Sequence, residues 1–310
     1  MRTVRTDARL APPASVPPPT HAAPAPAPAP APLAFPLGGP PDNTSSMLIR
    51  EDDRGVLVIG QPSHAWVSGQ LARAWGNERF GRVEPFEEVC LAAEQHDVGW
   101  AGRDLEPIYN PETGLPRSFV QMPLDVHLEL WREGPRSLLS QSRYAALLVS
   151  LHGWRLYERR DLSKLPPAEA DAIRSFLATQ RSFQQGLIAS LRADPTSAVG
   201  AEDGLVERNS LLIWTWDYLS LALCLDWPSA TAESAPTAEG QVDLNLMRGP
   251  EPHTLRVEPW PFATASVSVH CEGQRLRGRF EGEEQMRQGL ERAAWETLSL
   301  HLEPHPPAPA

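Results

Sequence analysis

The residues best suited to chemistry in this chain are histidines and aspartates that could hold divalent metal ions. His96 and Asp97 are adjacent and follow an apolar run from Val89 to Ala93. His64 precedes this pair, and Asp217 lies far downstream in the run Trp-Thr-Trp-Asp-Tyr-Leu-Ser-Leu-Ala-Leu-Cys. Neutral imidazoles and carboxylates are ligands that suit iron, manganese or zinc. A centre holding one or two of these metals is therefore the leading hypothesis.

Asp217 is the most informative single position after the His-Asp pair, because its surroundings predict a helix that is apolar nearly all round. A buried carboxylate without a partner is strongly unfavourable. A metal ion would remove that penalty, and so would an arginine or hydroxyl donors such as Thr215, Tyr218 or Ser220. The residues alone leave two interpretations open, a metal ligand and a hydrogen-bonded structural aspartate.

Two more histidines, His127 and His152, lie between the His-Asp pair and Asp217 in stretches predicted to be helical. A single histidine on an apolar helix face is more often a packed, hydrogen-bonded residue than a ligand, so each has both interpretations. His127 is the weaker candidate, because the preceding Met-Pro-Leu-Asp at 122–125 suggests a helix start near the surface. The full set of candidate metal ligands is His64, His96, Asp97, His127, His152 and Asp217.

Apolar periodicity predicts the helices that would position these residues. Val67, Leu71 and Ala74 recur at three- and four-residue steps and predict a helix over about 63–76, with His64 in its first turn. Pro85 begins a second helix that ends at the His-Asp pair. Further helices are predicted around 124–131, at 142–158, from Pro166 for roughly 25 residues, at 205–225 and at 283–300.

Strand-like runs occur at both ends of the foldable region. Residues 47–50 and 56–59 predict a hairpin, and 255–257, 265–270 and 275–280 alternate in the manner of strands. The expected fold is therefore mainly α: a helical core with a small accessory antiparallel β-sheet made from the N-terminal hairpin and the C-terminal strands.

The prolines set the expected domain boundaries. The chain has 310 residues and 33 prolines, many of them in the first 46 residues, where alternating Ala and Pro favour polyproline II. Residues 229–241 are rich in Ala, Ser, Thr and Glu. We expect a disordered segment at 1–46, a helical metal-binding domain at 47–228, a flexible linker at 229–241, a β-containing extension packed on the same domain at 242–303 and a disordered tail at 304–310. Whether translation starts at Met1 or Met47 stays open.

Charge and composition limit the partners. The net charge of -11 and the absence of a basic run argue against nucleic acid or an anionic membrane surface. No apolar run reaches the roughly 18 residues of a membrane span, and three widely spaced cysteines argue against a disulfide framework. We expect a cytoplasmic protein with a small-molecule substrate; the sequence does not indicate an oligomeric state.

The order of these residues resembles the HD-domain superfamily of metal-dependent phosphohydrolases over about residues 60–225. His64, the His96-Asp97 pair and Asp217 match that pattern in order. The resemblance implies an HD-type helical core, and it implies that members with two metals add histidines in the interval that holds His127 and His152. The chain is also similar to an uncharacterised bacterial domain-of-unknown-function family with Gln-x-x-His-Ala and Gln-His-Asp-x-Gly-Trp signatures, a likeness that brings no established activity.

The resemblance implies hydrolysis of a phosphoester, with metal ions activating water and Asp97 as the catalytic residue that orients it. Many HD phosphohydrolases have a lysine where this chain has Trp100, so arginines would have to bind the phosphate. The candidate substrate-binding residues are Trp100, Arg103 and Arg155. The alternatives are an HD-type di-iron oxygenase and a non-catalytic binding or signalling module.

Overall fold

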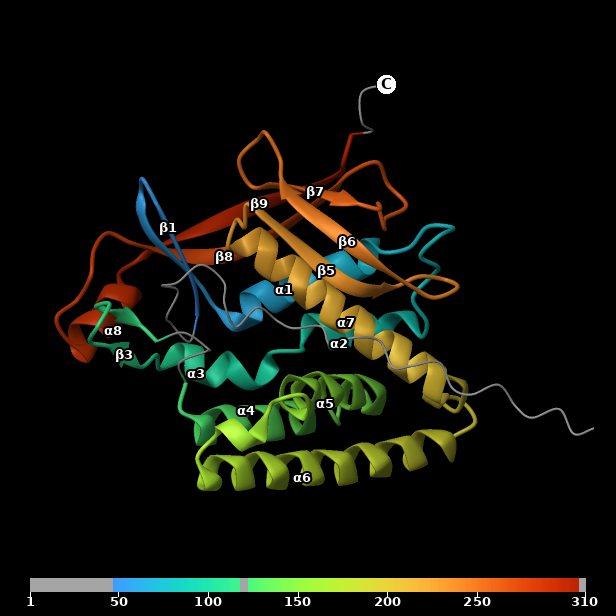
Figure 1. Cartoon of the computed structure of the whole chain (residues 1–310). Helices are drawn as coiled ribbons and strands as arrows, with labels where there is room; N and C mark the ends of the chain where they lie inside the picture. Colours follow the sequence, from blue (N-terminus) through green and yellow to red (C-terminus); the bar gives the residue numbers. More distant parts are fainter. Residues whose placement is uncertain (1–46, 118–121, 307–310) are drawn as a thin grey trace, which may run out of the picture. The chain divides into compact units, whose positions relative to one another are not determined.

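The computed structural model describes residues 47–117 and 122–306, which form a seven-stranded sheet with most of the helices against one face (Figure 1). Of these residues 48% are helical and 23% are in strands or bridges. The predicted fold class, mainly α with a small accessory antiparallel sheet, is therefore wrong. The disorder predicted for 1–46, and the end of the predicted tail, fall outside the described residues.

The sheet combines strands from both ends of the chain. Its spatial order is β1-β2-β8-β9-β7-β6-β5. Neighbouring strands are antiparallel except β7 and β9, which are parallel, so the sheet is mixed. The strands are β1 (Leu48–Asp52), β2 (Gly55–Ile59), β5 (Ser229–Pro236), β6 (Gln241–Arg248), β7 (Thr254–Glu258), β8 (Val267–Leu276) and β9 (Ala294–Pro304).

Two stretches explain why the sheet is larger than predicted. The predicted linker 229–241 contains β5, which packs against helix α7 and buries Ala232 and Ala235. Alanine has little strand preference of its own, so tertiary contacts decide the conformation here. The predicted helix 283–300 ends at Glu291, and β9 follows, with alternate residues buried at 298, 300 and 302. That period of two is the pattern of a strand.

The remaining predicted helices are confirmed. The α-helices are α1 (Gln61–Ala74), α2 (Phe86–Glu94), α3 (Ala101–Leu105), α4 (Leu124–Ser137), α5 (Arg143–Glu158), α6 (Pro167–Arg192), α7 (Asp203–Cys224) and α8 (Glu283–Glu291). The short helix α3 was not predicted. Short 3-10 turns occur at η1 (Val98–Trp100), η3 (Leu162–Lys164) and η4 (Val199–Ala201), and a small hairpin joins β3 (Tyr109–Asn110) to β4 (Leu115–Pro116).

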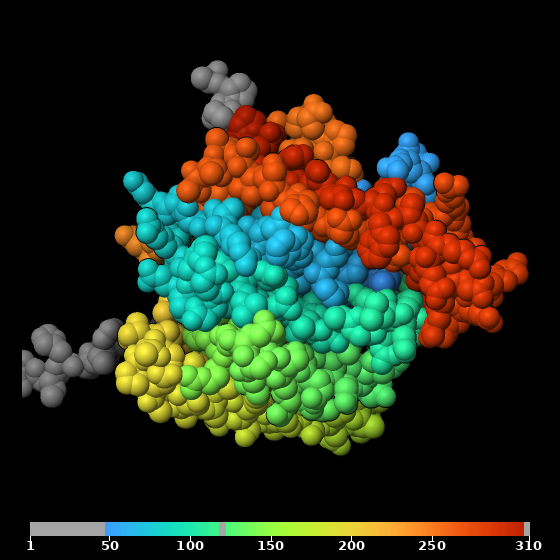
Figure 2. All heavy atoms as spheres, turned by 180° about the vertical axis from the view of Figure 1, so that it is seen from behind, coloured from blue at the N-terminus to red at the C-terminus, as the bar shows by residue number. Residues whose placement is uncertain are grey.

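The helices lie in successive layers on the sheet. Helix α1 contacts β8 and α7 contacts β5, while α2 and α5 pack behind them and α4 and α6 pack on α5. Figure 2 shows the same succession from behind: the C-terminal strands, the N-terminal elements and then α4 to α6 in green and yellow. Helix α7 lies inside this stack and is buried continuously from Asn209 to Cys224. A carboxylate at position 217 is therefore enclosed by protein.

Helix α1 also covers one edge of the sheet. Strand β2 pairs with only the last residues of β8, and side chains of α1 bond the rest of that edge. The Gln70 amide donates to the carbonyl of His270 (2.7 Å) and accepts from its N–H (3.1 Å), and the Ser63 hydroxyl bonds both backbone groups of Glu272 (2.7 and 3.0 Å). These bonds satisfy backbone groups that an open edge leaves unpaired. They also anchor the residue that precedes His64.

Two expectations drawn from composition can be compared with the structure. Cys90, Cys224 and Cys271 are free and buried, and the two closest sulfur atoms, those of Cys224 and Cys271, are 4.0 Å apart. All three thiols therefore lie in the core of the described region. Among the helices of residues 47–117 and 122–306, none is long and apolar enough to cross a membrane.

Candidate metal centre

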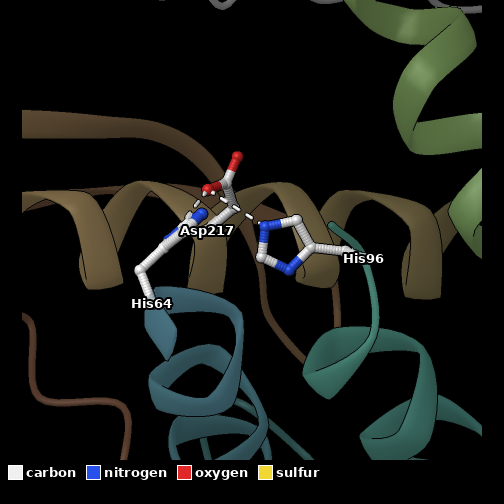
Figure 3. Close-up of side chains that lie close together, drawn as sticks. All are labelled: His64, His96 and Asp217. Atoms are coloured by element: carbon white, nitrogen blue, oxygen red, sulfur yellow. Dashed lines mark ion pairs between the residues drawn. The ribbon is translucent and has the colours of Figure 1, made fainter. Parts of the chain in front are cut away.

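Three residues from separate elements converge inside the helical layers. His64 comes from the start of α1, His96 follows the end of α2, and Asp217 lies in the middle of α7. One ligand atom from each lies within 4.8 Å of the others. Figure 3 shows the two imidazoles on either side of the Asp217 carboxylate. All three side chains are buried, so this group, which could hold a metal ion, is enclosed by protein.

Asp97 adds a second carboxylate to this group. Its Oδ2 atom lies 2.6 Å from Nε2 of His64 and 3.5 Å from Nε2 of His96. The same His96 nitrogen is 3.4 Å from Oδ1 of Asp217. Ligand atoms bound at about 2 Å around one tetrahedral ion lie roughly 3 to 3.5 Å from each other. The separations around His96 therefore suit the ligands of a single ion.

The hydrogen bonds of His64 fix its tautomer. The Ser220 hydroxyl donates to the carbonyl of Asp217 (2.8 Å), so it must accept from Nδ1 of His64 (2.9 Å). Nδ1 therefore carries a proton, and Nε2 faces the Asp97 carboxylate at 2.6 Å. A lone pair and a carboxylate oxygen repel each other at that distance. A cation bound at this position would remove that repulsion.

His96 has the same arrangement of its two nitrogens. Nδ1 donates to the carbonyl of Ala93 (2.8 Å), and Nε2 is buried with no hydrogen-bond partner in the described part of the chain. Metal-binding histidines characteristically bond the second ring nitrogen in this way, which fixes the tautomer and the ring orientation. Both Nε2 atoms are thus placed to bind a cation, and the donor set fits a divalent metal.

The imidazoles and carboxylates of this group shift each other's pKa values, because their charges are opposite. Burial alone would lower the pKa of His96, but the carboxylates of Asp97 and Asp217 outweigh it and raise that pKa to about 9. Burial alone would raise the pKa of Asp217, but His96, His152 and His64 lower it to about 2. Without a metal, the proton on His96 offsets part of the charge of the two buried carboxylates. A divalent cation would do the same and displace protons.

His152 lies beside the group, next to the second carboxylate oxygen of Asp217, Oδ2. Its Nε2 atom is 3.5 Å from Oδ2 of Asp217, and its ring centroid is 5.0 Å from that of His96. Its Nδ1 atom has no hydrogen-bond partner among the residues the structure describes. Burial lowers the pKa of His152 to about 4, so the ring is neutral and able to bind a cation. The structure thus brings His152 next to the predicted centre.

His127 lies apart from the other predicted ligands. Its Nδ1 atom bonds the hydroxyl of Tyr157, and its Nε2 atom accepts from the indole N–H of Trp131 (3.3 Å). Burial, reinforced by Arg160, lowers its pKa to about 4. Both ring nitrogens already have partners. The structure does not bring His127 together with His64, His96 and Asp217.

The predicted substrate-binding residues occupy different surroundings. Trp100 is buried, and its ring packs on His127, with 5.3 Å between the centroids. Arg103, in α3, has a buried Nε atom without a hydrogen-bond partner among the described residues. Arg155 bonds Glu207 and Ser210 of α7. Of these three residues, only Arg155 bonds α7, the helix that carries Asp217.

Close packing explains why position 99, in the His-Asp-Val-Gly segment, is a glycine. A Cβ atom added there would lie 2.4 Å from the carbonyl oxygen of Leu130, in α4. Only glycine lets the turn after His96 and Asp97 approach α4 this closely. The glycine therefore supports the position of the His-Asp pair through packing.

Sequence reasoning missed Asp104, which joins the turn after the His-Asp pair to the start of α1. Its Oδ2 atom accepts the N–H of Gln61 (2.7 Å), and its Oδ1 atom is buried without a partner in the described region. Burial raises its pKa to about 8, the bond from Gln61 acts against this, and Asp97 adds to it. No spacing in the sequence marks this contact, since the two residues are 43 positions apart.

Comparisons with known proteins identify a family. A family model described as "Protein of unknown function (DUF3891)" matches residues 47–278, well over half of the chain. No curated protein and no solved structure matches. The matched region includes all of the candidate ligands. The chain therefore belongs to the DUF3891 family of proteins of unknown function.

Proposed function

We propose that this protein is a divalent-metal-dependent hydrolase that acts on a phosphoester of a small molecule. The observation that carries the proposal is the convergence of two buried imidazole Nε2 atoms with two buried carboxylates, in which Nε2 of His96 has no hydrogen-bond partner within the described residues. The resemblance of His64, His96-Asp97 and Asp217 to the HD-domain superfamily supports the same reaction class. Iron, manganese and zinc all suit this donor set.

In this proposal the chain's own residues position the reaction. His64, His96, Asp97 and Asp217 would hold the ion, which when bound supplies a Lewis acid and lowers the pKa of water. Ser220 and the carbonyl of Ala93 keep both imidazoles in the tautomer that leaves Nε2 free. Oδ2 of Asp97, which faces Nε2 of His64, is placed to orient the attacking water and to accept its proton. The surrounding helices exclude bulk solvent.

An iron-dependent oxygenase is the second candidate, because aromatic rings surround the imidazoles. The ring of His152 lies 5.4 Å from that of Trp131 and 5.5 Å from that of Trp214, centroid to centroid. Imidazole and carboxylate ligands in such apolar surroundings also suit iron that activates dioxygen. This candidate predicts bound iron and oxygen uptake with no phosphoester hydrolysis.

Metal content is the first test. The full chain is purified without chelator or histidine tag and analysed for metals, beside the double variant His96→Ala, Asp97→Ala. The matched control is His127→Gln, which changes a histidine of the same helical layers that lies apart from the centre. We expect at least about one equivalent of metal in the parent and the control and none in the double variant.

Activity is then measured with p-nitrophenyl phosphate and bis(p-nitrophenyl) phosphate in the presence of Mn²⁺, Fe²⁺ or Zn²⁺. Hydrolysis that requires the metal and is lost in the double variant supports the proposal. Bound iron with oxygen uptake and no hydrolysis would favour the oxygenase. Absence of metal from every sample, even after reconstitution, would contradict both and favour a non-catalytic binding module.

A further inference from the structure

Arg155 is a largely enclosed arginine with a buried, unused donor. It lies on α5, and its side chain is 10% exposed. Its Nη2 atom bonds both carboxylate oxygens of Glu207 (3.1 and 3.2 Å) and the hydroxyl of Ser210 (3.2 Å). Its Nε atom is buried and has no hydrogen-bond partner among the described residues. Buried unpaired donors are rare and call for an explanation, such as a ligand.

The unused donor lies on the edge of the guanidinium that binds anions. Nε and Nη2 form one side of its planar fork, and this side matches two oxygens of a phosphate or carboxylate. Glu207 engages only the Nη2 half of that side. A phosphate, with more oxygens in a tetrahedral arrangement, could bond Nε, Nη2 and the Ser210 hydroxyl together.

This arginine adjoins the candidate metal centre. Helices α5 and α7 pack together, with His152 beside Asp217 and, one turn further along α5, Arg155 beside Ser210. Ser210 and Asp217 are seven residues apart on α7, which corresponds to two helical turns or about 10 Å. An anion on Arg155 would therefore lie at that distance from the metal ligands.

Three arginines and two glutamates lie near each other here, so the local charge is less negative than the net charge of -11 suggests. Arg159 and Arg181 lie in the same region: the Arg159 Nε atom is 3.8 Å from Glu158, and Arg181 stacks over the ring of Trp154 at 5.7 Å. The carboxylate of Glu207 is 60% exposed. Such an exposed partner is held weakly and can leave the guanidinium.

We propose that Arg155 and Ser210 form an anion-binding subsite for a phosphate group of the substrate, and that the Glu207 carboxylate fills this subsite until the phosphate binds. The assignment of the anion to the substrate rests on the proposed function. It narrows the substrate class to small molecules that carry an acidic group on the order of 10 Å from the bond that is cleaved. The exposed Glu207 would disfavour substrates that lack this group.

Inorganic phosphate is the probe, titrated calorimetrically into the full chain after metal has been removed with chelator. Glu207→Gln should bind phosphate about fivefold more tightly than the parent, because the competing negative charge is gone. Arg155→Gln should show no binding. Asp203→Asn is the matched control: it removes a negative charge from the same helix, but Asp203 pairs with Arg192, so phosphate affinity should not change.

A variant that fails to fold is recognised by its circular dichroism melting curve. Arg155→Lys provides a second measurement, since it keeps the charge but loses the fork and should bind phosphate about fivefold more weakly than the parent. Equal affinity in Glu207→Gln and the parent, binding that survives in Arg155→Gln, or no binding in any variant would overturn the subsite. Because the titration uses metal-free protein, its failure is distinct from a failure of metal-dependent hydrolysis.

Discussion

Two regions of the helical layers hold histidines whose pKa values are shifted in opposite directions. In the candidate metal centre, the pKa of His96 is raised to about 9. In the group formed by His127, Trp131 and Tyr157, the pKa of His127 is lowered to about 4. Both rings pack among helices, with His96 buried and His127 half-buried. The partners therefore decide the outcome, and the comparison shows which histidines are available to a cation.

The two groups differ in the charge of the residues around the histidine and in whether each ring nitrogen has a hydrogen-bond partner. The Trp131 indole N–H occupies Nε2 of His127, so Nδ1 carries the proton and bonds the oxygen of Tyr157. All of these partners are neutral, and neither ring nitrogen is left over. Around His96 the partners are two carboxylates, and Nε2 has no hydrogen bond within the described residues. The first group is complete by itself, whereas the second keeps an imidazole nitrogen that could bind a cation.

The largest effect is expected from Asp217→Asn, which keeps the shape of the side chain and removes its charge. Metal affinity should fall by at least roughly 100-fold, because a charged ligand is lost from a buried site. The measurement is a competition titration with a chelating dye. His127→Gln serves as the control and should bind metal like the parent. If both variants bind metal equally well, the distinction between the two groups does not hold.

The next largest effect is expected in the pH dependence of metal affinity, which tests whether His96 is a ligand. Below pH 9 the metal-free His96 is protonated, and a metal ion must displace that proton. Affinity should therefore rise by about tenfold per pH unit from pH 6.5 until it levels off near pH 9. Titrations at pH 6.5, 7.5 and 8.5 would show this slope. An affinity that does not change over this range would mean that His96 is not a ligand.

His152→Ala should have a smaller effect, because His152 touches only the second oxygen of Asp217. We expect one equivalent of metal to remain, with about tenfold weaker affinity, as is usual for a residue that supports a ligand. Elemental analysis and the dye titration give both quantities. A fall from two equivalents to one would instead make His152 the ligand of a second ion.

The last expected effect, at His127, concerns stability and not metal affinity. A histidine whose pKa is lowered from about 6.5 to about 4 by folding stabilises the protein above pH 6.5, and this contribution is lost as the pH falls toward 4. The loss should be on the order of 1 to 3 kcal/mol. His127→Gln has no such titration, so the difference in unfolding free energy between it and the parent should shrink over this range. Denaturant unfolding at pH 7, 5.5 and 4.5 measures it.

The sequence could predict the helices and the order of the ligands, because both depend on local patterns. Apolar periodicity places α1, α2, α5 and α7, and the buried position of Asp217 follows from its apolar helix. The size of the sheet could not be predicted, since β5 is poor in strand-forming residues and since β2 pairs with β8 across the whole helical region.

The sequence also could not predict which histidines lie at the candidate site. His127 and His152 both lie in amphipathic helical stretches between the His-Asp pair and Asp217. The difference between them comes from Tyr157 and Trp131, which occupy the nitrogens of His127, and from α7, which brings Asp217 to His152. These are contacts between helices, and a periodic pattern in one helix does not contain them.

The bonds from Gln70 and Ser63 to the backbone of β8 have a consequence for self-association. An uncovered strand edge is a template on which a second chain can add a strand and start aggregation. Here the helix that presents His64 shields that edge, and the amides of His270 and Glu272 should resist hydrogen exchange although side chains alone cover them. A change that loosens α1 would therefore weaken the candidate site and make the protein prone to precipitate, so solubility and activity should be lost together.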